Sequence, residues 1–412
     1  MNDAGVLVIG AGAAGLMAAG TAASMGRRVV VLEKNERPAR KVLITGKGRC
    51  NVTNDCDRDV FLQNIPQNPR FLFSALSQLS PRETMAFFES QGLPLKTERG
   101  SRVFPCSDQA KDVADTLVRY AKDAGAQFVT GTAASLLFQE DAVRGVALSD
   151  GRELFASSVI VATGGLSYPK TGSTGDGYRF ARAAGHKVVQ PGASLVPIVI
   201  EEPWCRDLMG LSLRNVTLTA ARQGVSHPVY QELGEMLFTH FGVSGPLVLS
   251  ASAHIRGLPK ERYSLAVDLK PGLSPEQLDA RLLRDFAKFQ NRDLINSLGD
   301  LLPRKLIPVI VALSGIPFER KVHQITREER ARLVSLMKGL TMTVKGFRPV
   351  EEAIVTTGGV DVAQVNPKTM ESKLKKGLYF AGEVLDVDGY TGGFNLQIAF
   401  STGYAAGMHC GA

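Results

Sequence analysis

The residues of this chain that are able to do chemistry gather in short glycine-rich stretches. The densest, residues 40–54, reads RKVLITGKGRCNVTN and brings four cations, two glycines and one cysteine together. Cys50 stands beside Arg49, and a neighbouring cation favours the thiolate, so this thiol is a candidate proton donor with a lowered pKa. The alternative is that Cys50 is a small buried residue and that Arg49 pairs with an acid instead of holding phosphate or substrate oxygens.

Three further side chains are candidate donors to a bound ligand. His240 lies in the aromatic and glycine-rich stretch FTHFGVSGP. It faces the ligand in one interpretation and packs against Phe238 and Phe241 in the other. Tyr168 and Tyr390 stand in other glycine-rich turns, where a phenol either donates a hydrogen bond to the ligand or stacks and caps the turn.

Neither a metal site nor a disulfide framework is predicted. The remaining histidines show no ligand spacing, and the five cysteines form no CxxC pair. An odd, scattered set of cysteines is typical of a reducing compartment, so we expect a cytoplasmic protein.

The elements that position these candidates begin at the N-terminus. Residues 5–10 (GVLVIG) form an apolar run typical of a buried parallel strand, and glycines in GxGxxG spacing then open an alanine-rich helix. A second apolar run, 28–32, is closed by Glu33, which stands 18 positions after the last of these glycines. The pattern predicts a βαβ unit that binds a dinucleotide.

Each residue of this unit has a physical task. Gly10 makes the turn, Gly12 lets the backbone approach a pyrophosphate, and Gly15 lets the helix pack closely on the strand. The helix N-terminus offers amide donors and a dipole that favours an anion. Glu33 accepts hydrogen bonds from ribose hydroxyls and disfavours a 2′-phosphate.

Two later strands also end in small-residue turns. Residues 158–162 (SVIVA) run into 163–165 (TGG), and residues 377–380 (GLYF) run into 381–383 (AGE). The turn GYTGGFN then precedes a last helix, 396–408. Because ligands of parallel sheets lie beyond the carboxyl ends of the strands, we expect these turns to meet one extended ligand.

The predicted fold class is α/β, with a discontinuous Rossmann-type domain. That domain comprises residues 1–190 plus 350–412. Residues 191–270 plus 339–349 alternate short apolar strands with turns, so we expect a β-rich, barrel-like insert that binds substrate. Residues 271–338 carry helix-period patterns and predict a small helical insert.

The ligand is predicted to be FAD. NAD and FAD share the N-terminal pattern, but a glycine-rich turn within the last 30 residues is expected only where a long ligand carries a flavin at its far end. The N-terminus of the last helix is able to face the pyrimidine oxygens of that ring. No second GxGxxG is present, so NAD(P)H is expected as a diffusible reductant without a domain of its own.

These stretches, with ATGG-x-SYP-x-TGSTGDGY and GLYFAGEVLDVDGYTGGFN-x-Q, resemble the BaiN/RdsA-like NAD(P)/FAD-dependent oxidoreductases from Val6 to about Gly407. The resemblance implies an FAD domain interrupted by a β-rich insert and a helical insert. It also implies that Lys41 and residues 46–51 wrap the flavin end of FAD. Lys47 departs from the family pattern, in which many members have glycine, and this bears on the shape of the turn.

The resemblance implies reduction of a conjugated double bond in one of two substrates. One is a 3-oxo dehydro-bile acid, a steroid reduced at its 4,5 and 6,7 bonds, and the other is a uracil of 23S ribosomal RNA, reduced to dihydrouridine. The spelling GEVLDVDGYTGGFN is closer to that of the steroid-reducing members, so we favour the steroid. His240, Tyr168, Cys50 and Tyr390 are the candidates to polarise the carbonyl or to protonate carbon.

Contacts to the cofactor are expected from the following residues: Gly10, Gly12, Ala13, Ala14, Gly15, Glu33, Lys34, Lys41, Gly46, Gly48, Arg49, Cys50, Asn51, Thr163, Gly164, Gly165, Gly382, Glu383, Asp386, Gly392, Gly393, Phe394 and Asn395.

Composition leaves other functions open. The formal charge of +8 and basic segments at 318–321 and 373–376 allow ribosomal RNA as a partner, although FAD and NAD(P)H are anions too. A flavin oxidase of a small amine or ketone, and a flavin-holding RNA or assembly protein without activity, are further alternatives. Residues 5–26 lack charge but contain six glycines and no basic flank, so no membrane association is expected. The oligomeric state is not indicated.

Overall fold

Two compact units make up the chain in the computed structural model, which describes residues 4–411. The first unit combines the residues up to Ser194 with those from Pro349 onward, and the second is Leu195–Arg348. Each unit has its own cluster of buried apolar side chains. The first unit is therefore discontinuous in sequence, because the C-terminal residues complete the fold that the N-terminal residues begin.

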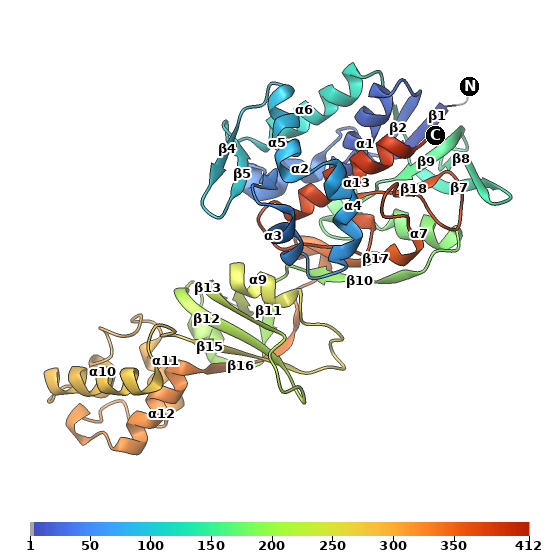
Figure 1. Cartoon of the computed structure of the whole chain (residues 1–412). Coiled ribbons are helices and arrows are strands. Elements are labelled where there is room, and N and C mark those ends of the chain that lie inside the picture. The colour runs from blue at the N-terminus through green and yellow to red at the C-terminus, as the bar shows by residue number, and fades with distance from the viewer. Residues whose placement is uncertain (1–3, 412) are drawn as a thin grey trace. The chain divides into compact units, whose positions relative to one another are not determined.

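A seven-stranded sheet in the order β6-β2-β1-β9-β8-β7, with β18 beside β9, organises the first unit (Figure 1). Its parallel strands are β1 (Ala4–Ile9), β2 (Val29–Glu33), β6 (Gln127–Thr130), β9 (Glu153–Val161) and β18 (Leu378–Phe380). The remaining two, β7 (Ala133–Gln139) and β8 (Ala142–Leu148), are antiparallel. The carboxyl ends of β1, β9 and β18 consequently meet at one edge of the sheet.

Helices from the two ends of the chain pack against each other beside this sheet. They are α1 (Ala13–Ser24) and α13 (Phe394–His409), both rich in alanine and glycine. A Cβ added at Gly403 would lie 2.4 Å from the carbonyl oxygen of Ala14, and one at Gly407 would lie 2.6 Å from that of Ala18. Because only glycine permits this approach, these residues bring the C-terminal helix onto the N-terminal one.

Smaller elements complete the first unit. Strands β3 (Thr53–Asn54), β5 (Arg102–Pro105) and β4 (Leu95–Glu98) form one antiparallel sheet, and β10 (Val188–Ser194) pairs with β17 (Val355–Val360). The helices are α2 (Arg40–Ile44), α3 (Arg58–Gln63), α4 (Phe73–Gln78), α5 (Pro81–Ser90), α6 (Ala110–Asp123) and α7 (Asp176–Ala183).

The second unit is built on a closed barrel. Its strands, in order, are β11 (Ile198–Ile200), β14 (Gly242–Ser244), β13 (Tyr230–Thr239), β12 (Ser212–Arg222), β15 (Tyr263–Asp268) and β16 (Leu340–Phe347). Short helices α8 (Trp204–Asp207) and α9 (Pro246–Ser252) accompany it. Between β15 and β16 the chain forms α10 (Pro275–Lys288), α11 (Ile307–Ser314) and α12 (Arg327–Lys338), grouped at one end of the barrel in Figure 1.

The predicted fold class is confirmed: a Rossmann-type α/β sheet is accompanied by a β-barrel and a helical segment. The exact three-part division of the chain stays a prediction. No helix within residues 4–411 has both the length and the apolar character needed to cross a bilayer.

Candidate active site

A cavity of about 810 Å³ lies at the carboxyl edge of the parallel sheet, and all of its lining residues belong to the first unit. The turns after β1, β9 and β18 line it, as do α2 and the turn before α13. A Cβ at Gly10 would lie 2.6 Å from the oxygen of Ala162, and one at Gly382 would lie 2.8 Å from Cβ of Ala14. The three turns are therefore in direct contact around one space.

Most of the residues expected to contact a cofactor line this cavity. They are Gly10, Gly12, Ala13, Ala14, Glu33, Lys34, Lys41, Gly46, Arg49, Asn51, Thr163, Gly164, Gly382, Glu383, Gly392, Gly393 and Asn395, together with Tyr168 and Tyr390. The expected residues that do not line it are Gly15, Gly48, Cys50, Gly165, Asp386 and Phe394.

The β1–α1 turn has the geometry of an anion site. Gly10 has a φ of 100°, and Gly12 is the N-cap of α1 without any capping side chain. A Cβ added at Gly12 would meet no protein atom within 4 Å, so the space before the helix is open. The unpaired amides of the first helical turn therefore face a region that a phosphate is able to enter. Gly15 has the predicted packing role, because its Cβ would lie 1.9 Å from the oxygen of Gly10.

Glu33 stabilises the turn itself. Its Oε2 accepts a hydrogen bond of 2.8 Å from the backbone amide of Ala11, and its Oε1 accepts one of 2.8 Å from that of Asn35. Oε1 also accepts a hydrogen bond of 2.8 Å from Asn35 Nδ2, so Oε2 is the oxygen that keeps a second lone pair for a ligand hydroxyl. The structural role of Glu33 was not predicted, because both partners depend on how the turn folds.

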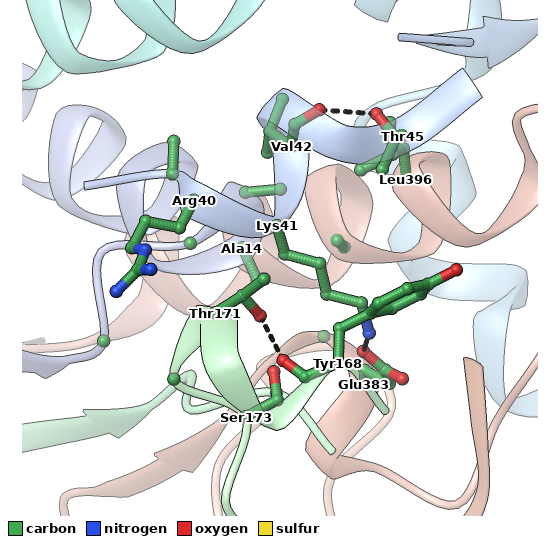
Figure 2. A pocket seen from close by; sticks show the side chains of 18 of the residues that line it. Ala14, Arg40, Lys41, Val42, Thr45, Tyr168, Thr171, Ser173, Glu383 and Leu396 are labelled. Atoms are coloured by element: carbon green, nitrogen blue, oxygen red, sulfur yellow. Dashed lines mark hydrogen bonds and ion pairs between the residues drawn. The ribbon is translucent and has the colours of Figure 1, made fainter. Parts of the chain in front are cut away.

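An ion pair across the cavity wall joins distant parts of the chain (Figure 2). Lys41 Nζ donates to Glu383 Oε2 and to Ser167 Oγ, each at 2.6 Å. Ser167 Oγ donates to Glu383 Oε1 at 3.0 Å, and the amide of Thr356 donates to the same oxygen at 2.8 Å. Tyr168 lies beside the pair, with its ring centroid 5.9 Å from Lys41 Nζ. The pair holds α2 against the turns after β9 and β18.

Two buried polar atoms of the cavity wall have no protein partner among the described residues. They are Asn51 Oδ1 and Thr163 Oγ1. A buried polar atom without a hydrogen bond costs about 1–3 kcal/mol, so these two atoms would be stabilised by a partner that the free protein does not supply. The open space at Gly12 and the three turns around the cavity show that the residues present fit an extended polar ligand of dinucleotide size.

The turn before α13 closes the far end of the cavity. Gly393 has a φ of 100°, and its Cβ would lie 2.3 Å from the carbonyl of Thr53, so this position requires glycine. Asn395 Oδ1 accepts from the amide of Gly389 at 2.9 Å, and its Nδ2 donates to the carbonyls of Gly389 and Tyr390. Asn395 thus fixes the turn that presents the N-terminus of α13 to the cavity.

Of the two interpretations of Cys50, the small buried residue is confirmed and the lowered thiol pKa is wrong. Cys50 is fully buried, and burial raises its pKa to about 12. Arg49 instead binds Glu98 and Asp108, with Nε 2.9 Å from Asp108 Oδ1. Both carboxyls lie outside residues 40–54 and neutralise the charge of Arg49, so its position next to Cys50 in the sequence does not lower the pKa of the thiol.

Asp386 and Phe394, which were expected to contact the cofactor, have protein partners instead. The buried carboxylate of Asp386 accepts a hydrogen bond from Asn68 Nδ2 at 3.1 Å, and Phe394 packs edge-on against Phe61 with ring centroids 5.2 Å apart. His240 lies in the second unit, exposed between β13 and β14, where its ring packs edge-on against Phe241. The cavity residues belong to the first unit, and a catalytic role of His240 stays a proposal.

Several lining residues escaped the sequence analysis. Examples are Asn35, Arg40, Arg102, Phe104 and Ile354. Arg102 and Phe104 belong to β5, a short strand with no glycine-rich signal, and only its pairing with β3 brings it beside the turn that follows α2. Asn35 was detectable in principle, because it follows directly on the acid that ends β2.

Comparisons with known proteins agree with this architecture. The family described as HI0933-like protein Rossmann domain matches residues 4–409. A 3-dehydro-bile acid delta(4,6)-reductase of Clostridium scindens is 33% identical, covering 99% of this chain and 98% of that protein. A ribosomal RNA dihydrouridine synthase of Escherichia coli is 32% identical, covering 97% of this chain and 96% of that protein. A second one, of Haemophilus influenzae, is 34% identical, covering 98% of this chain and 97% of that protein. These matches confirm the family resemblance.

One solved structure shows the same fold at low identity. The 3-ketosteroid-delta4-(5alpha)-dehydrogenase of Rhodococcus jostii aligns with a TM-score of 0.51 at 15% identity, covering 100% of this chain and 97% of that one.

Proposed function

Because the chain belongs to the HI0933-like Rossmann-domain family of flavin-dependent oxidoreductases, we propose that it binds FAD and uses NAD(P)H to reduce a conjugated carbon–carbon double bond. One observation carries the proposal. Three turns from distant parts of the chain surround one cavity, and Asn51 Oδ1 and Thr163 Oγ1 are buried there without a protein partner in the described chain.

The residues divide along the length of the proposed cofactor. Glu33 receives the ribose hydroxyls, and the first turn of α1 after Gly12 receives the pyrophosphate. Lys41, Asn51 and the N-terminus of α13 serve the ring end. When bound, FAD supplies the hydride chemistry.

The protein itself must position the substrate and deliver a proton. Each double bond takes up one hydride, which originates from NAD(P)H and leaves NAD(P)⁺, and one proton from a side chain or water. Tyr168 and Tyr390 line the cavity and are the leading proton donors. Cys50 is not proposed, because burial raises its pKa to about 12 and it does not line the cavity.

We propose a 3-oxo dehydro-bile acid as the substrate, reduced at its 4,5 and 6,7 double bonds. Support comes from the full-length similarity to the Clostridium scindens reductase and from the C-terminal motif spelling. In such an enone the carbonyl needs a hydrogen-bond donor, and a phenol of Tyr168 or Tyr390 has the required chemistry.

A uridine of ribosomal RNA is the second candidate, because one segment of the chain is strongly basic. Residues 271–338 carry twelve Lys and Arg against eight Asp and Glu, an excess of four that is half of the formal charge of +8. The two dihydrouridine synthases support this candidate with similar identities. RNA binding would weaken steeply as salt rises, whereas steroid binding would respond little.

Anaerobic spectroscopy tests the proposal. The protein is bleached with NAD(P)H, and a 3-oxo-4,6-diene bile acid, its saturated analogue or undermodified ribosomal RNA is then added. We expect the diene to restore the yellow absorbance and the saturated analogue to leave it unchanged. Recovery with RNA alone would assign the second candidate, and recovery with oxygen alone would indicate an oxidase.

Two matched variants identify the proton donor. Tyr168→Phe and Tyr390→Phe remove one phenol each and leave the ring in place. We expect the donor variant to slow recovery of the yellow absorbance by about 10²-fold or more, with bleaching by NAD(P)H unchanged. Equal, full rates in both variants would exclude both phenols.

A further inference from the structure

The cations on the cavity wall divide into a paired group and an unpaired group. Those with a carboxylate partner are Lys34 with Asp176 (2.8 Å), Arg37 with Asp115 (3.9 Å), Lys41 with Glu383 (2.6 Å) and Arg49 with Glu98 and Asp108. Among residues 4–411, Arg40, Lys47 and Arg102 line the cavity without any carboxylate in ion-pair distance. Arg40 donates to Asn35 Oδ1 at 3.0 Å, near Glu33.

Arg102 and the glycine that precedes Lys47 both approach the ring of Phe104. The guanidinium of Arg102 lies 5.9 Å from the ring centroid of Phe104, which is buried. A Cβ added at Gly46, directly before Lys47, would lie 3.6 Å from Cε1 of the same ring. Both side chains are exposed in the free protein, and the Arg102 Nε bond to the carbonyl of Arg99 leaves its remaining N–H groups available.

The backbone of Lys47 is the second unusual feature. Its φ of 58° and ψ of 41° place a long side chain in the left-handed region, which glycine enters without steric cost. Neighbouring Gly46 has the same conformation, with φ of 55° and ψ of 32°. A lysine in this conformation destabilises the turn relative to glycine. We therefore infer that the ammonium group of Lys47 has a function that offsets this cost.

We propose that Lys47 and Arg102 form an anion subsite on the Phe104 side of the cavity. It binds an oxyanion of the small molecule that enters beside the cofactor, either the carboxylate of the reducible substrate or a phosphate of the nicotinamide nucleotide. This inference rests on the proposed function. The guanidinium offers paired N–H donors to two oxygens, and the ammonium adds a point charge.

The phosphates of FAD itself do not require this subsite. They are assigned to the N-terminus of α1, whose first turn contains no acidic residue to oppose them. Lys47 and Arg102 belong instead to the turn after α2 and to β5, elements outside the parallel sheet.

Four variants of the full-length protein test the subsite. Lys47→Asn removes the charge and tolerates the left-handed backbone, Lys47→Arg keeps the charge, and Arg102→Gln removes the second charge. Arg99→Gln is the matched control, because Arg99 is exposed on the same hairpin and does not line the cavity. Circular dichroism and thermal unfolding verify that each variant folds.

Equilibrium dialysis gives the Kd of four probes: a 3-oxo-4,6-diene bile acid, its neutral methyl ester, NADPH and NADH. We expect Lys47→Asn and Arg102→Gln each to raise the Kd of the free acid at least tenfold, with the ester within twofold of wild type. Lys47→Arg and Arg99→Gln keep the wild-type Kd. If NADPH and NADH weaken instead of the acid, the bound oxyanion is a nucleotide phosphate.

Three results would overturn the subsite: unchanged Kd values for the acid and both nucleotides, equal weakening of acid and ester, or a loss of FAD affinity in Lys47→Asn and Arg102→Gln. If the wild-type protein takes up no FAD, the proposed function fails, and the same dialysis without flavin still decides whether the two cations bind the oxyanion.

Discussion

Gly12 contributes to the cavity through the side chain that it lacks. Its φ of −83° and ψ of −172° are accessible to any residue, and no protein atom lies within 4 Å of an added Cβ. Folding therefore does not require glycine at this position. A ligand that approaches the first turn of α1 requires it, because a side chain would occupy the same space. The distinction separates a structural glycine from one that serves binding.

Replacing Gly12 by valine is expected to leave folding intact and to weaken cofactor binding. We predict an FAD affinity at least tenfold lower, a loss of about 1.4 kcal/mol, with a thermal midpoint of the flavin-free protein close to wild type. Flavin titration monitored by fluorescence measures the affinity. Gly346→Val in β16, also without a neighbour within 4 Å, is the control and should bind FAD normally. Normal FAD binding by Gly12→Val would mean that the phosphates of FAD do not bind at the first turn of α1.

Cys50 is expected to be unreactive in the folded protein. Burial raises its pKa from 9.0 to about 12, so the thiol stays protonated at pH 8. We predict that iodoacetamide at pH 8 modifies exposed Cys106 and leaves Cys50 unmodified until the chain is denatured, as peptide mass spectrometry would show.

The same shift has a consequence for stability at high pH. Between the two values the unfolded chain releases the proton while the folded chain keeps it, so the free energy of unfolding falls as pH rises from 9.0 towards about 12. Cys50→Ala should reduce this fall. Rapid alkylation of Cys50 in the native protein would contradict the buried position.

At the scale of elements, the contact of α1 with α13 holds the two ends of the chain together. Alanine in a helix interior normally stabilises relative to glycine by about 0.5–1 kcal/mol. At Gly403 the added methyl would lie 2.4 Å from the oxygen of Ala14, so we predict that Gly403→Ala destabilises by about 1–3 kcal/mol. Urea unfolding measures the change.

Gly299→Ala is the control for this prediction. No atom lies within 4 Å of an added Cβ at Gly299, and its φ is not positive, so its effect should be below about 0.5 kcal/mol. A Gly403→Ala protein as stable as wild type would mean that the helices pack less closely than described.

The parallel sheet and its turns were predictable because their signals are local. Apolar runs of strand length and glycines at fixed spacing identified β1, α1 and the ends of β9 and β18. The last helix begins at Phe394, two residues before the predicted start, since Gly393 is already its N-cap. The β5 strand, which supplies Arg102 and Phe104, has no such signal and was missed.

The side-chain partners of the site were much less predictable. Lys41 was expected near the flavin, but its partner Glu383 stands 342 positions away. For Arg49 both a ligand contact and an acidic partner were predicted, and tertiary folding brings Glu98 and Asp108 to it, two acids that the sequence did not single out. Such pairs depend on which strands and turns become neighbours, and no periodicity within one element encodes that.

At the scale of the whole molecule, the chain builds two cores, and the first draws on both of its ends. Because of this discontinuity, the cavity forms only when the N-terminal βαβ unit, the turn after β9 and the C-terminal turn are all in place. The prediction that FAD binds there therefore tests the position of all three segments. A ligand bound there reports on all three at once.

The flavin stoichiometry of the purified protein is the most direct measurement. The protein is incubated with excess FAD and freed of unbound ligand by gel filtration. It is then denatured, so that the released flavin is identified by chromatography and counted by absorbance. We predict about one FAD per chain, with FMN and NAD⁺ failing to replace it. A colourless protein that retains no FAD after this treatment would show that the three turns do not form an FAD site.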